Sequence, residues 1–241
     1  MREASGVDEG SEFSPIFQDG SVVGTLVGGD RAVIVFGGIG LVDNYRLQRP
    51  LVQRLARRGV ATLIVRDRHR QAHLFGFGSF FPSRVAAIVA LKTFLASRGY
   101  SNVATIGISL GGHAAVVYAA ELGASGALTL SGATRLVVDE NEPRARALFE
   151  RVSAIGRIDC ADLVPLIKAH PNMKIHAYYP KLAKYDRYQA ERLTGLQNVT
   201  LYPQNQFTHV ISTHWGEAQW SEALDSFFKD CGWTPSPLSV G

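Results

Sequence analysis

Residues 107–111, with the sequence Gly-Ile-Ser-Leu-Gly, constrain the fold of this chain more than any other feature. They follow an apolar, β-prone run at residues 103–106 and precede a run of small and apolar residues at 113–118 that favours a helix. This order predicts a buried strand, a sharp turn that carries Ser109, and a helix. Glycine at both ends of the turn allows the backbone to fold tightly around the serine.

Ser109 stands at a position that suits a nucleophile. A serine hydroxyl reacts poorly in water, so an enzyme that uses one must expose the oxygen, supply a base and bind the oxyanion that forms. The predicted turn exposes the oxygen, and the helix after it directs backbone amides toward developing negative charge. Because G-x-S-x-G also occurs by chance, it is the flanking strand and helix that favour catalysis over an ordinary glycine-rich turn.

With this strand, turn and helix the chain resembles the α/β-hydrolase superfamily. The nucleophile of that family lies on such a turn, between the central parallel strand and the next helix. The resemblance extends from about Ala32 to about Asp230, and only the segment around Ser109 is specific. It implies that an acid and then a histidine follow the serine along the chain.

Apolar runs alternate with helical patterns along the rest of the chain. Strands are predicted near residues 32–36, 60–65, 127–130, 174–179 and 199–202, and helices near residues 46–58, 83–97, 185–193 and 217–228. This alternation predicts an α/β fold with a mainly parallel sheet covered by helices on both faces, here the α/β-hydrolase fold. Residues 17–27 alternate between apolar and polar, which predicts a hairpin that turns at Asp19-Gly20.

Length and composition indicate a single domain over residues 1–241. The chain is 46% hydrophobic and 19% charged, which suits one substantial core. Residues 1–12 are polar and rich in Gly, Glu and Ser, so a frayed terminus is expected there. Residues 133–169 are longer and more charged than the other connections, and they predict a small helical insert that caps the site and selects the substrate.

The distribution of charge and hydropathy argues against a membrane span or nucleic-acid binding. No apolar run approaches the length that crosses a bilayer, and the first ten residues lack the apolar core of a signal peptide, so a cytoplasmic location is expected. The net charge of +4 is modest, and no aromatic residues interleave a basic stripe. One stretch is crowded with arginines that are expected mainly to form a solvated helix face: Arg46, Arg49, Arg54, Arg57, Arg58, Arg66, Arg68 and Arg70.

Neither the cysteines nor the histidines predict a metal site. Cys160 and Cys231 lie far apart and have no partner at zinc-finger spacing, so neither a disulfide framework nor a structural zinc is expected. His69 and His73 stand four residues apart, as metal ligands on a helix do, but the arginines and glycines around them indicate a loop. We therefore expect no metal ion and no cofactor.

The base in the resembling family is a histidine on the loop after the last strand. His209 follows the predicted strand at 199–202 by a short loop, whereas His214 falls at the predicted start of the final helix. His209 is favoured because a loop leaves the imidazole free to reach Ser109, and His214 is the alternative. His113, in the helix after the serine, is interpreted as a packed helix residue.

The third member in that family is a carboxylate after the penultimate strand, which fixes the imidazole tautomer and stabilises the imidazolium. Asp186 has this position, because it follows the predicted strand at 174–179 and leads into a helical pattern. The other interpretation of Asp186 is a residue that satisfies free amides at a helix N-terminus. Asp139 and Glu140 follow the preceding strand and are the alternative acids, since some family members use that strand.

An oxyanion hole in the family takes one backbone amide from the residue after the nucleophile and one from the turn after the first parallel strand. Leu110 is the first candidate, and Gly38 is the second, because the pair Gly37-Gly38 permits close approach of a ligand. Many family members have a His-Gly pair where this chain has Phe36-Gly37.

These residues predict a serine hydrolase that acts through an acyl-enzyme, in which Ser109 attacks, His209 transfers the proton and Asp186 orients the histidine. Cleavage of an ester or thioester in a small acyl substrate is preferred. The open alternatives are cleavage of a peptide, lactone or amide, an acyltransferase on the same triad, and a catalytically silent hydrolase-like scaffold that binds a small molecule or a partner.

Overall fold

A computed structural model describes residues 13–38, 49–67, 73–77, 81, 83–136, 146, 149–150, 153–154 and 160–233. The strands are β1 (Ser14–Pro15), β2 (Val22–Thr25), β3 (Arg31–Phe36), β4 (Ala61–Val65), β5 (Asn102–Ile108), β6 (Gly126–Leu130), β7 (Lys174–Pro180) and β8 (Val199–Gln204). The helices are α1 (Arg49–Arg57), α2 (Arg84–Ser97), α3 (Leu110–Leu122), α5 (Leu163–Ala169), α6 (Lys184–Glu191), the 3₁₀ helix η1 (Ile211–His214) and α7 (Glu217–Asp230).

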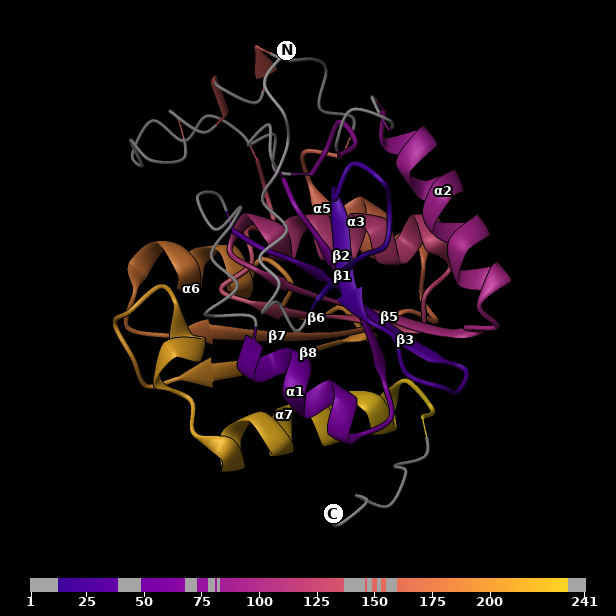
Figure 1. Ribbon diagram of the computed structural model, residues 1–241. Coiled ribbons are helices and arrows are strands. Elements are labelled where there is room, and N and C mark those ends of the chain that lie inside the picture. The colour runs from indigo at the N-terminus through magenta and orange to yellow at the C-terminus, as the bar shows by residue number, and fades with distance from the viewer. Residues whose placement is uncertain are drawn as a thin grey trace, which may run out of the picture.

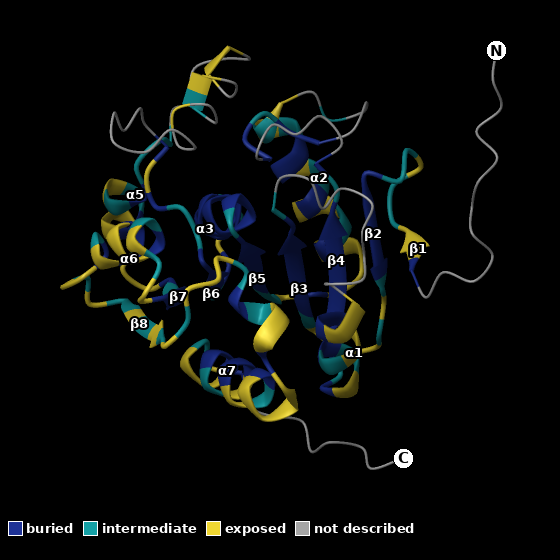
Figure 2. Cartoon of the chain, turned by 90° about the vertical axis from the view of Figure 1, so that its left-hand side faces the viewer, coloured by how far each residue is buried: buried dark blue, intermediate teal, exposed yellow. Residues whose placement is uncertain are grey.

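The strands form one eight-stranded sheet in the order β1-β2-β4-β3-β5-β6-β7-β8. From β4 to β8 every neighbouring pair is parallel, and at the other edge β2 pairs antiparallel with both β4 and β1. Helices α1 and α7 cover one face of the sheet, and α2, α3, α5 and α6 lie on the other (Figures 1 and 2). The predicted fold class is therefore confirmed.

The central strands are apolar throughout because helices cover both of their faces. Strands β4 and β6 are buried at every position, and β3 is buried at every position after Arg31. A strand buried on both faces gains from an apolar side chain at every position, so it shows a continuous apolar run instead of alternation. This is why the strands were predictable from the sequence to within a few residues.

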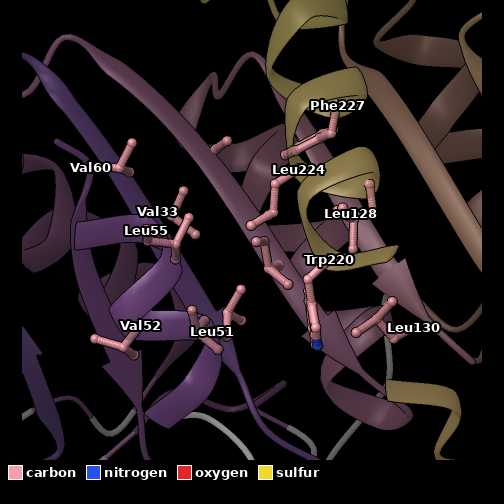
Figure 3. Packing of buried hydrophobic residues seen from close by; sticks show 14 of the residues in the cluster. Val33, Leu51, Val52, Leu55, Val60, Leu128, Leu130, Trp220, Leu224 and Phe227 are labelled. Carbon is pink, nitrogen blue, oxygen red and sulfur yellow. The ribbon is translucent and has the colours of Figure 1, made fainter. Parts of the chain in front are cut away.

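Each face of the sheet has its own core. Figure 3 shows the α1 and α7 side, where Leu51 and Leu55 of α1 and Leu224 and Phe227 of α7 meet strand residues such as Val33. On the opposite face, side chains of α2 and α3 pack against β3 and β4. Burial of one large aliphatic or aromatic side chain contributes about 1.5–3 kcal/mol, so these two layers hold the sheet in place.

The amino-terminal hairpin differs from its prediction. A turn over residues 16–21 contains Asp19-Gly20 as expected, and the Asp19 side chain accepts a hydrogen bond from the Ser21 amide at 2.9 Å. The first strand, however, is β1 at Ser14–Pro15, before the predicted range of 17–27. Phe17 lies outside the strands, and its ring packs against the rings of Phe77 and Phe81.

Arg54 of α1 and Arg58, directly after it, differ from the expected solvated helix face, whereas Arg57 is 60% exposed as expected. The side chains of Arg54 and Arg58 are only 11% and 10% exposed. Arg58 binds Asp225 at 2.9 Å, and Arg54 binds Glu217, so both pair with acids of α7. The helical pattern could not show this, because the partners lie about 160 residues further along the chain.

Cys160 and Cys231 are both free thiols in the structure. Burial raises the pKa of the Cys231 thiol to about 12, so this thiol stays protonated at neutral pH. No helix within the described ranges is long and apolar enough to cross a membrane.

Much of the predicted insert at 133–169 lies outside the described residues, as do residues 1–12. Its last part is described and forms α5, which packs on α3 through Leu163 and Ile167 against Val116 and Ala120. Helix α5 therefore belongs to the layer that covers the sheet.

Candidate active site

The candidate site residues gather where the parallel strands end. Ser109 directly follows β5, and Gly38 is the second residue after β3, the neighbour of β5 in the sheet. Asp186 lies in the first turn of α6, after β7, and His209 lies in the loop after β8. The carboxyl ends of parallel strands lie at one edge of the sheet, where α/β proteins bind their ligands.

Ser109 has a strained backbone, with φ 57° and ψ −122°. A residue other than glycine in such a conformation costs on the order of 1–3 kcal/mol, and the cost persists where neighbouring structure enforces it. Here the Ser109 amide donates to the Leu130 carbonyl at 2.9 Å, and its carbonyl accepts from the Gly112 amide at 2.9 Å. These bonds hold the predicted sharp turn between β5 and α3.

The glycines of the motif are required by close packing of the backbone. A Cβ on Gly107 would lie 2.0 Å from the Gly111 carbonyl oxygen, and a Cβ on Gly111 would lie 2.2 Å from the Phe36 carbonyl oxygen. A Cβ on Gly112 would lie 2.7 Å from the Cα of Gly132. Helix α3 can therefore begin directly against β3 and β6 only because these positions have no side chain.

Replacement of Gly111 by alanine is expected to lower the free energy of unfolding by about 3 kcal/mol or more, because the added methyl group meets backbone atoms that cannot move independently. The control is Gly28→Ala, because a Cβ there has no atom within 4 Å. Denaturant unfolding of both variants measures the difference. Equal stabilities of the two variants would contradict the close contact between α3 and β3.

Ser109, His209 and Asp186 form a hydrogen-bonded chain. The Ser109 Oγ lies 2.8 Å from Nε2 of His209, and Nδ1 of His209 lies 2.7 Å from Oδ1 of Asp186. An ionised carboxylate only accepts hydrogen bonds, so Nδ1 carries the ring proton and Nε2 is free to accept the hydroxyl proton. The structure thus joins the three residues that the sequence singled out.

The side chains of His209 and Asp186 differ in their exposure to solvent. The His209 side chain is 44% exposed, whereas the Asp186 side chain is only 8% exposed. A base that is open to solvent can meet a substrate, and a buried carboxylate holds the imidazole without competition from water. Asp186 does not cap α6, since the N-cap residue is Ala183 and it makes no side-chain capping bond.

The other candidates lie elsewhere or outside the described residues. His214 ends the 3₁₀ helix η1, before the final helix that was predicted to contain it, and its side chain is exposed. His113 is fully buried, with its ring nitrogens 3.1 Å and 2.9 Å from the carbonyl oxygens of Ala133 and Cys160. Burial lowers the pKa of His113 to about 4, so it is a packed, neutral residue as predicted. Asp139 and Glu140 lie outside the described residues.

Two amides suit the binding of an oxyanion beside Ser109. Leu110 opens α3, whose N-terminus carries partial positive charge, and Gly38 lies on the neighbouring loop after β3. Within the described part of the chain, no carbonyl accepts a hydrogen bond from either amide.

Sequence reasoning missed Ser131, which supports His209. Ser131 follows β6, has φ 53° and is 4% exposed, and its hydroxyl donates a short hydrogen bond to the His209 carbonyl. Its amide donates to the Tyr178 carbonyl at 2.8 Å. The available signal was a serine directly after a buried strand, as at Ser109.

A second support holds the helix that carries Asp186. The Gln189 side chain is buried in the same helix, and its oxygen accepts hydrogen bonds from the amides of Thr134 and Arg135 at 2.8 and 2.9 Å. Arg192 extends this contact by binding Asp162 at 2.6 Å. These contacts connect α6 to the segment after β6 and so restrict the position of Asp186.

Metal-binding side chains do not cluster in this region. Among the described residues, no group of three or more His, Cys, Asp or Glu side chains could hold a metal ion. His73, one of the two histidines at helical spacing, lies between β4 and α2, and His69 is outside the described residues.

The chain is similar to known proteins in its structure but not in its sequence. No family model matches the sequence, and no curated protein sequence matches it. An α/β hydrolase enzyme from the metagenome of sediments of the lagoon of Mar Chica, Morocco, superposes with a TM-score of 0.62 at 16% identity, over 92% of this chain and 100% of that one.

Two further solved structures are similar over nearly the whole chain. Thermogutta terrifontis esterase 2, phosphonylated by sarin, has a TM-score of 0.64 at 16% identity and covers 95% of this chain and 97% of that one. An S-formylglutathione hydrolase from Agrobacterium tumefaciens has a TM-score of 0.58 at 11% identity, with 91% and 94% covered. Given the strand order, the strained turn at Ser109 and these superpositions, the chain has the α/β-hydrolase fold.

Proposed function

We propose that this protein is a serine hydrolase that cleaves an ester or thioester of a small molecule through an acyl-enzyme intermediate. The observation that carries the proposal is the hydrogen-bonded chain from the Ser109 Oγ through His209 to Asp186. Nucleophile, base and orienting carboxylate in this order are what acyl transfer to a serine requires.

In the first half of the reaction, the Ser109 Oγ attacks the acyl carbon while its proton moves to Nε2 of His209. The π electrons of the carbonyl move to its oxygen, and the imidazolium that forms is stabilised by the Asp186 carboxylate. The amides of Leu110 and Gly38 then bind the oxyanion, an interaction that contributes several kcal/mol in characterised enzymes of this chemistry.

In the second half, the oxyanion collapses and the bond from the acyl carbon to the leaving oxygen or sulfur breaks. The leaving group takes the proton from Nε2 of His209, and the acyl group stays on Ser109. Water then attacks the acyl carbon while Nε2 of His209 takes its proton. The bond to the Ser109 Oγ breaks, the Oγ regains a proton from Nε2, and the acid is released. This cycle uses no cofactor.

The similar structures support this reaction class. One is an esterase that sarin phosphonylates, and another is a hydrolase of the thioester S-formylglutathione. In this chain the exposed His209 ring would serve as the base for such a reaction. The amides of Leu110 and Gly38, which donate to no carbonyl among the described residues, would bind the oxyanion. We therefore favour esters and thioesters over amides as substrates.

A panel of acyl esters and thioesters of graded chain length tests the proposal, with wild-type protein and Ser109→Ala assayed side by side. We expect the wild-type protein to hydrolyse at least one member, and Ser109→Ala to hydrolyse the same member about 10⁶-fold more slowly. Addition of a primary alcohol separates hydrolysis from acyl transfer, since a transferase forms a new ester. A wild-type rate no higher than that of Ser109→Ala on every member would contradict the proposal and favour a silent binding scaffold.

Replacement of Asp186 by asparagine is expected to lower kcat by about 10⁴-fold, because an amide in place of the carboxylate favours the wrong imidazole tautomer. The fold should persist, since the two side chains have nearly the same shape. Steady-state kinetics on the best ester, with circular dichroism as a check of folding, measure the effect.

Asp139→Asn and Glu140→Gln serve as comparisons, because both residues are alternative acids. We expect each to retain most of the wild-type activity. An active Asp186→Asn protein beside an inactive variant of either residue would move the acid to the loop after β6 and leave Ser109 and His209 in place.

A further inference from the structure

His73 is a buried residue with an unusual backbone, close to the candidate oxyanion hole. It lies between β4 and α2, is 1% exposed and has φ 61°, a left-handed conformation that disfavours most side chains. Its carbonyl accepts a hydrogen bond from the Tyr118 hydroxyl at 2.9 Å, and its ring packs edge-on against Phe36 at the end of β3. The surrounding structure therefore enforces this strained conformation, as is frequent at functional sites.

The His73 ring contacts the peptide group that carries one candidate oxyanion donor. Its Nε2 lies 3.1 Å from the Gly37 carbonyl oxygen. That carbonyl and the Gly38 N–H belong to one peptide group, and in a planar trans peptide the two bonds point in opposite directions. The Gly37 oxygen also faces α3, since a Cβ on Gly111 would lie 2.5 Å from it. The Gly38 N–H therefore points away from the imidazole.

The protonation of His73 follows from its partners. A carbonyl oxygen can only accept, so Nε2 carries a proton and donates it to Gly37. Burial lowers the pKa of His73, although the Asp67 carboxylate and the Gly37 carbonyl oppose this effect, so the ring is neutral and has a single N–H. Nδ1 is buried and has no hydrogen-bonding partner among the described residues. The ring thus directs its one donor to the Gly37 carbonyl.

We propose that His73 is a positioning residue that fixes the Gly37–Gly38 peptide so that the Gly38 N–H serves as a donor of the oxyanion hole. This inference rests on the proposed function and adds a residue to it. Gly37 and Gly38 have no side chains to restrict their rotation, so an external contact is needed to hold the peptide plane. A hydrogen bond to the carbonyl also polarises the peptide group and makes its N–H a stronger donor.

The substitutions that test this role are His73→Leu, which removes the donor at similar volume, and His73→Gln, which keeps an N–H within reach of the Gly37 carbonyl. The probe is a trifluoromethyl ketone that matches the preferred ester, because its adduct with Ser109 places an oxyanion in the hole. We expect His73→Leu to lower kcat and weaken inhibition by the same factor, about 10- to 100-fold, with little change in KM. His73→Gln should restore both constants to within about threefold of wild type.

His176→Leu is the matched control, since His176 is equally buried and its Nε2 binds Asp230 at 2.9 Å, away from the Gly37 carbonyl. This variant is expected to lose stability without a parallel loss of kcat and inhibitor affinity. An active wild-type enzyme with kcat and inhibition unchanged in His73→Leu would overturn this inference alone. A wild-type protein that hydrolyses no ester and leaves Ser109 unmodified would overturn the proposed function, and this inference with it.

A measurement on the unmodified protein applies even where His73→Leu does not fold. Nitrogen-15 NMR shifts of the His73 ring distinguish the two neutral tautomers. We expect the Nε2-protonated form, together with a downfield shift of the Gly38 amide proton when the trifluoromethyl ketone binds. An Nδ1-protonated ring, or a Gly38 amide that the inhibitor leaves unshifted, would overturn the inference.

Discussion

Alanine in place of Ser109 is expected to lower kcat on the best ester by about 10⁶-fold, the largest effect of any single change in this protein. The variant loses the oxygen that forms the acyl-enzyme, while His209, Asp186 and both candidate oxyanion donors remain. Activity should not fall to the uncatalysed rate, because binding and the oxyanion hole retain about 10³-fold over water in characterised enzymes of this kind.

Ser97→Ala is the control for this measurement. Ser97 ends α2, where its exposed hydroxyl binds the Phe94 carbonyl at 2.7 Å. It precedes the start of β5, whereas Ser109 follows the end of that strand. We expect wild-type kcat for Ser97→Ala. A Ser109→Ala protein that keeps more than about one-hundredth of the wild-type kcat would contradict a covalent mechanism at this residue.

His209→Ala is expected to lower kcat by at least about 10³-fold and up to about 10⁶-fold, because the Ser109 hydroxyl then has no group to accept its proton. The His209 backbone stays in place, since Ser131 binds its carbonyl and not its ring. The loss should therefore reflect the missing base and not a displaced loop.

His214→Ala separates the two histidines that the sequence offered as bases. Its side chain is exposed on η1, so we expect most of the activity to remain and the melting temperature to change little. Stopped-flow or steady-state kinetics on both variants, after circular dichroism, measure the contrast. An inactive His214→Ala protein beside an active His209→Ala protein would reverse the assignment.

The order of strands and helices was predictable because a doubly covered parallel sheet leaves a strong trace in the sequence. Apolar runs such as residues 32–36 and 127–130 are continuous, since helices bury both faces of those strands. The hairpin was harder to predict. Its first strand has only two residues. Phe17, which fits the alternating pattern in the sequence, lies outside the strands and packs against Phe77 and Phe81.

The residues of the hydrogen-bonded chain were predictable by a different route. Ser109 was located by its strand, turn and helix, and His209 and Asp186 by their order after particular strands. Parallel topology then brings distant loops together, so that Ser109 and His209 meet although 100 residues separate them. Their separation of 2.8 Å required the structure.

The supporting residues escaped prediction because their roles depend on contacts distant in the sequence. Ser131 binds a carbonyl 78 residues away, and His73 binds one 36 residues away. Ser131 directly follows a buried strand, but no local pattern indicates which carbonyl it binds, and His73 has the local sequence of an ordinary loop residue. The cytoplasmic location, the cap at 133–169 and the absence of nucleic-acid binding stay predictions.

Mass spectrometry after treatment with a fluorophosphonate tests the central claim most directly. In this reaction the Ser109 Oγ would attack phosphorus, fluoride would leave, and His209 would take the proton. We predict one adduct per wild-type chain, mapped to the peptide that contains Ser109, with much slower labelling of His209→Ala and none of Ser109→Ala. Equal labelling of Ser109→Ala, or no labelling of a wild-type protein that hydrolyses esters, would contradict the account.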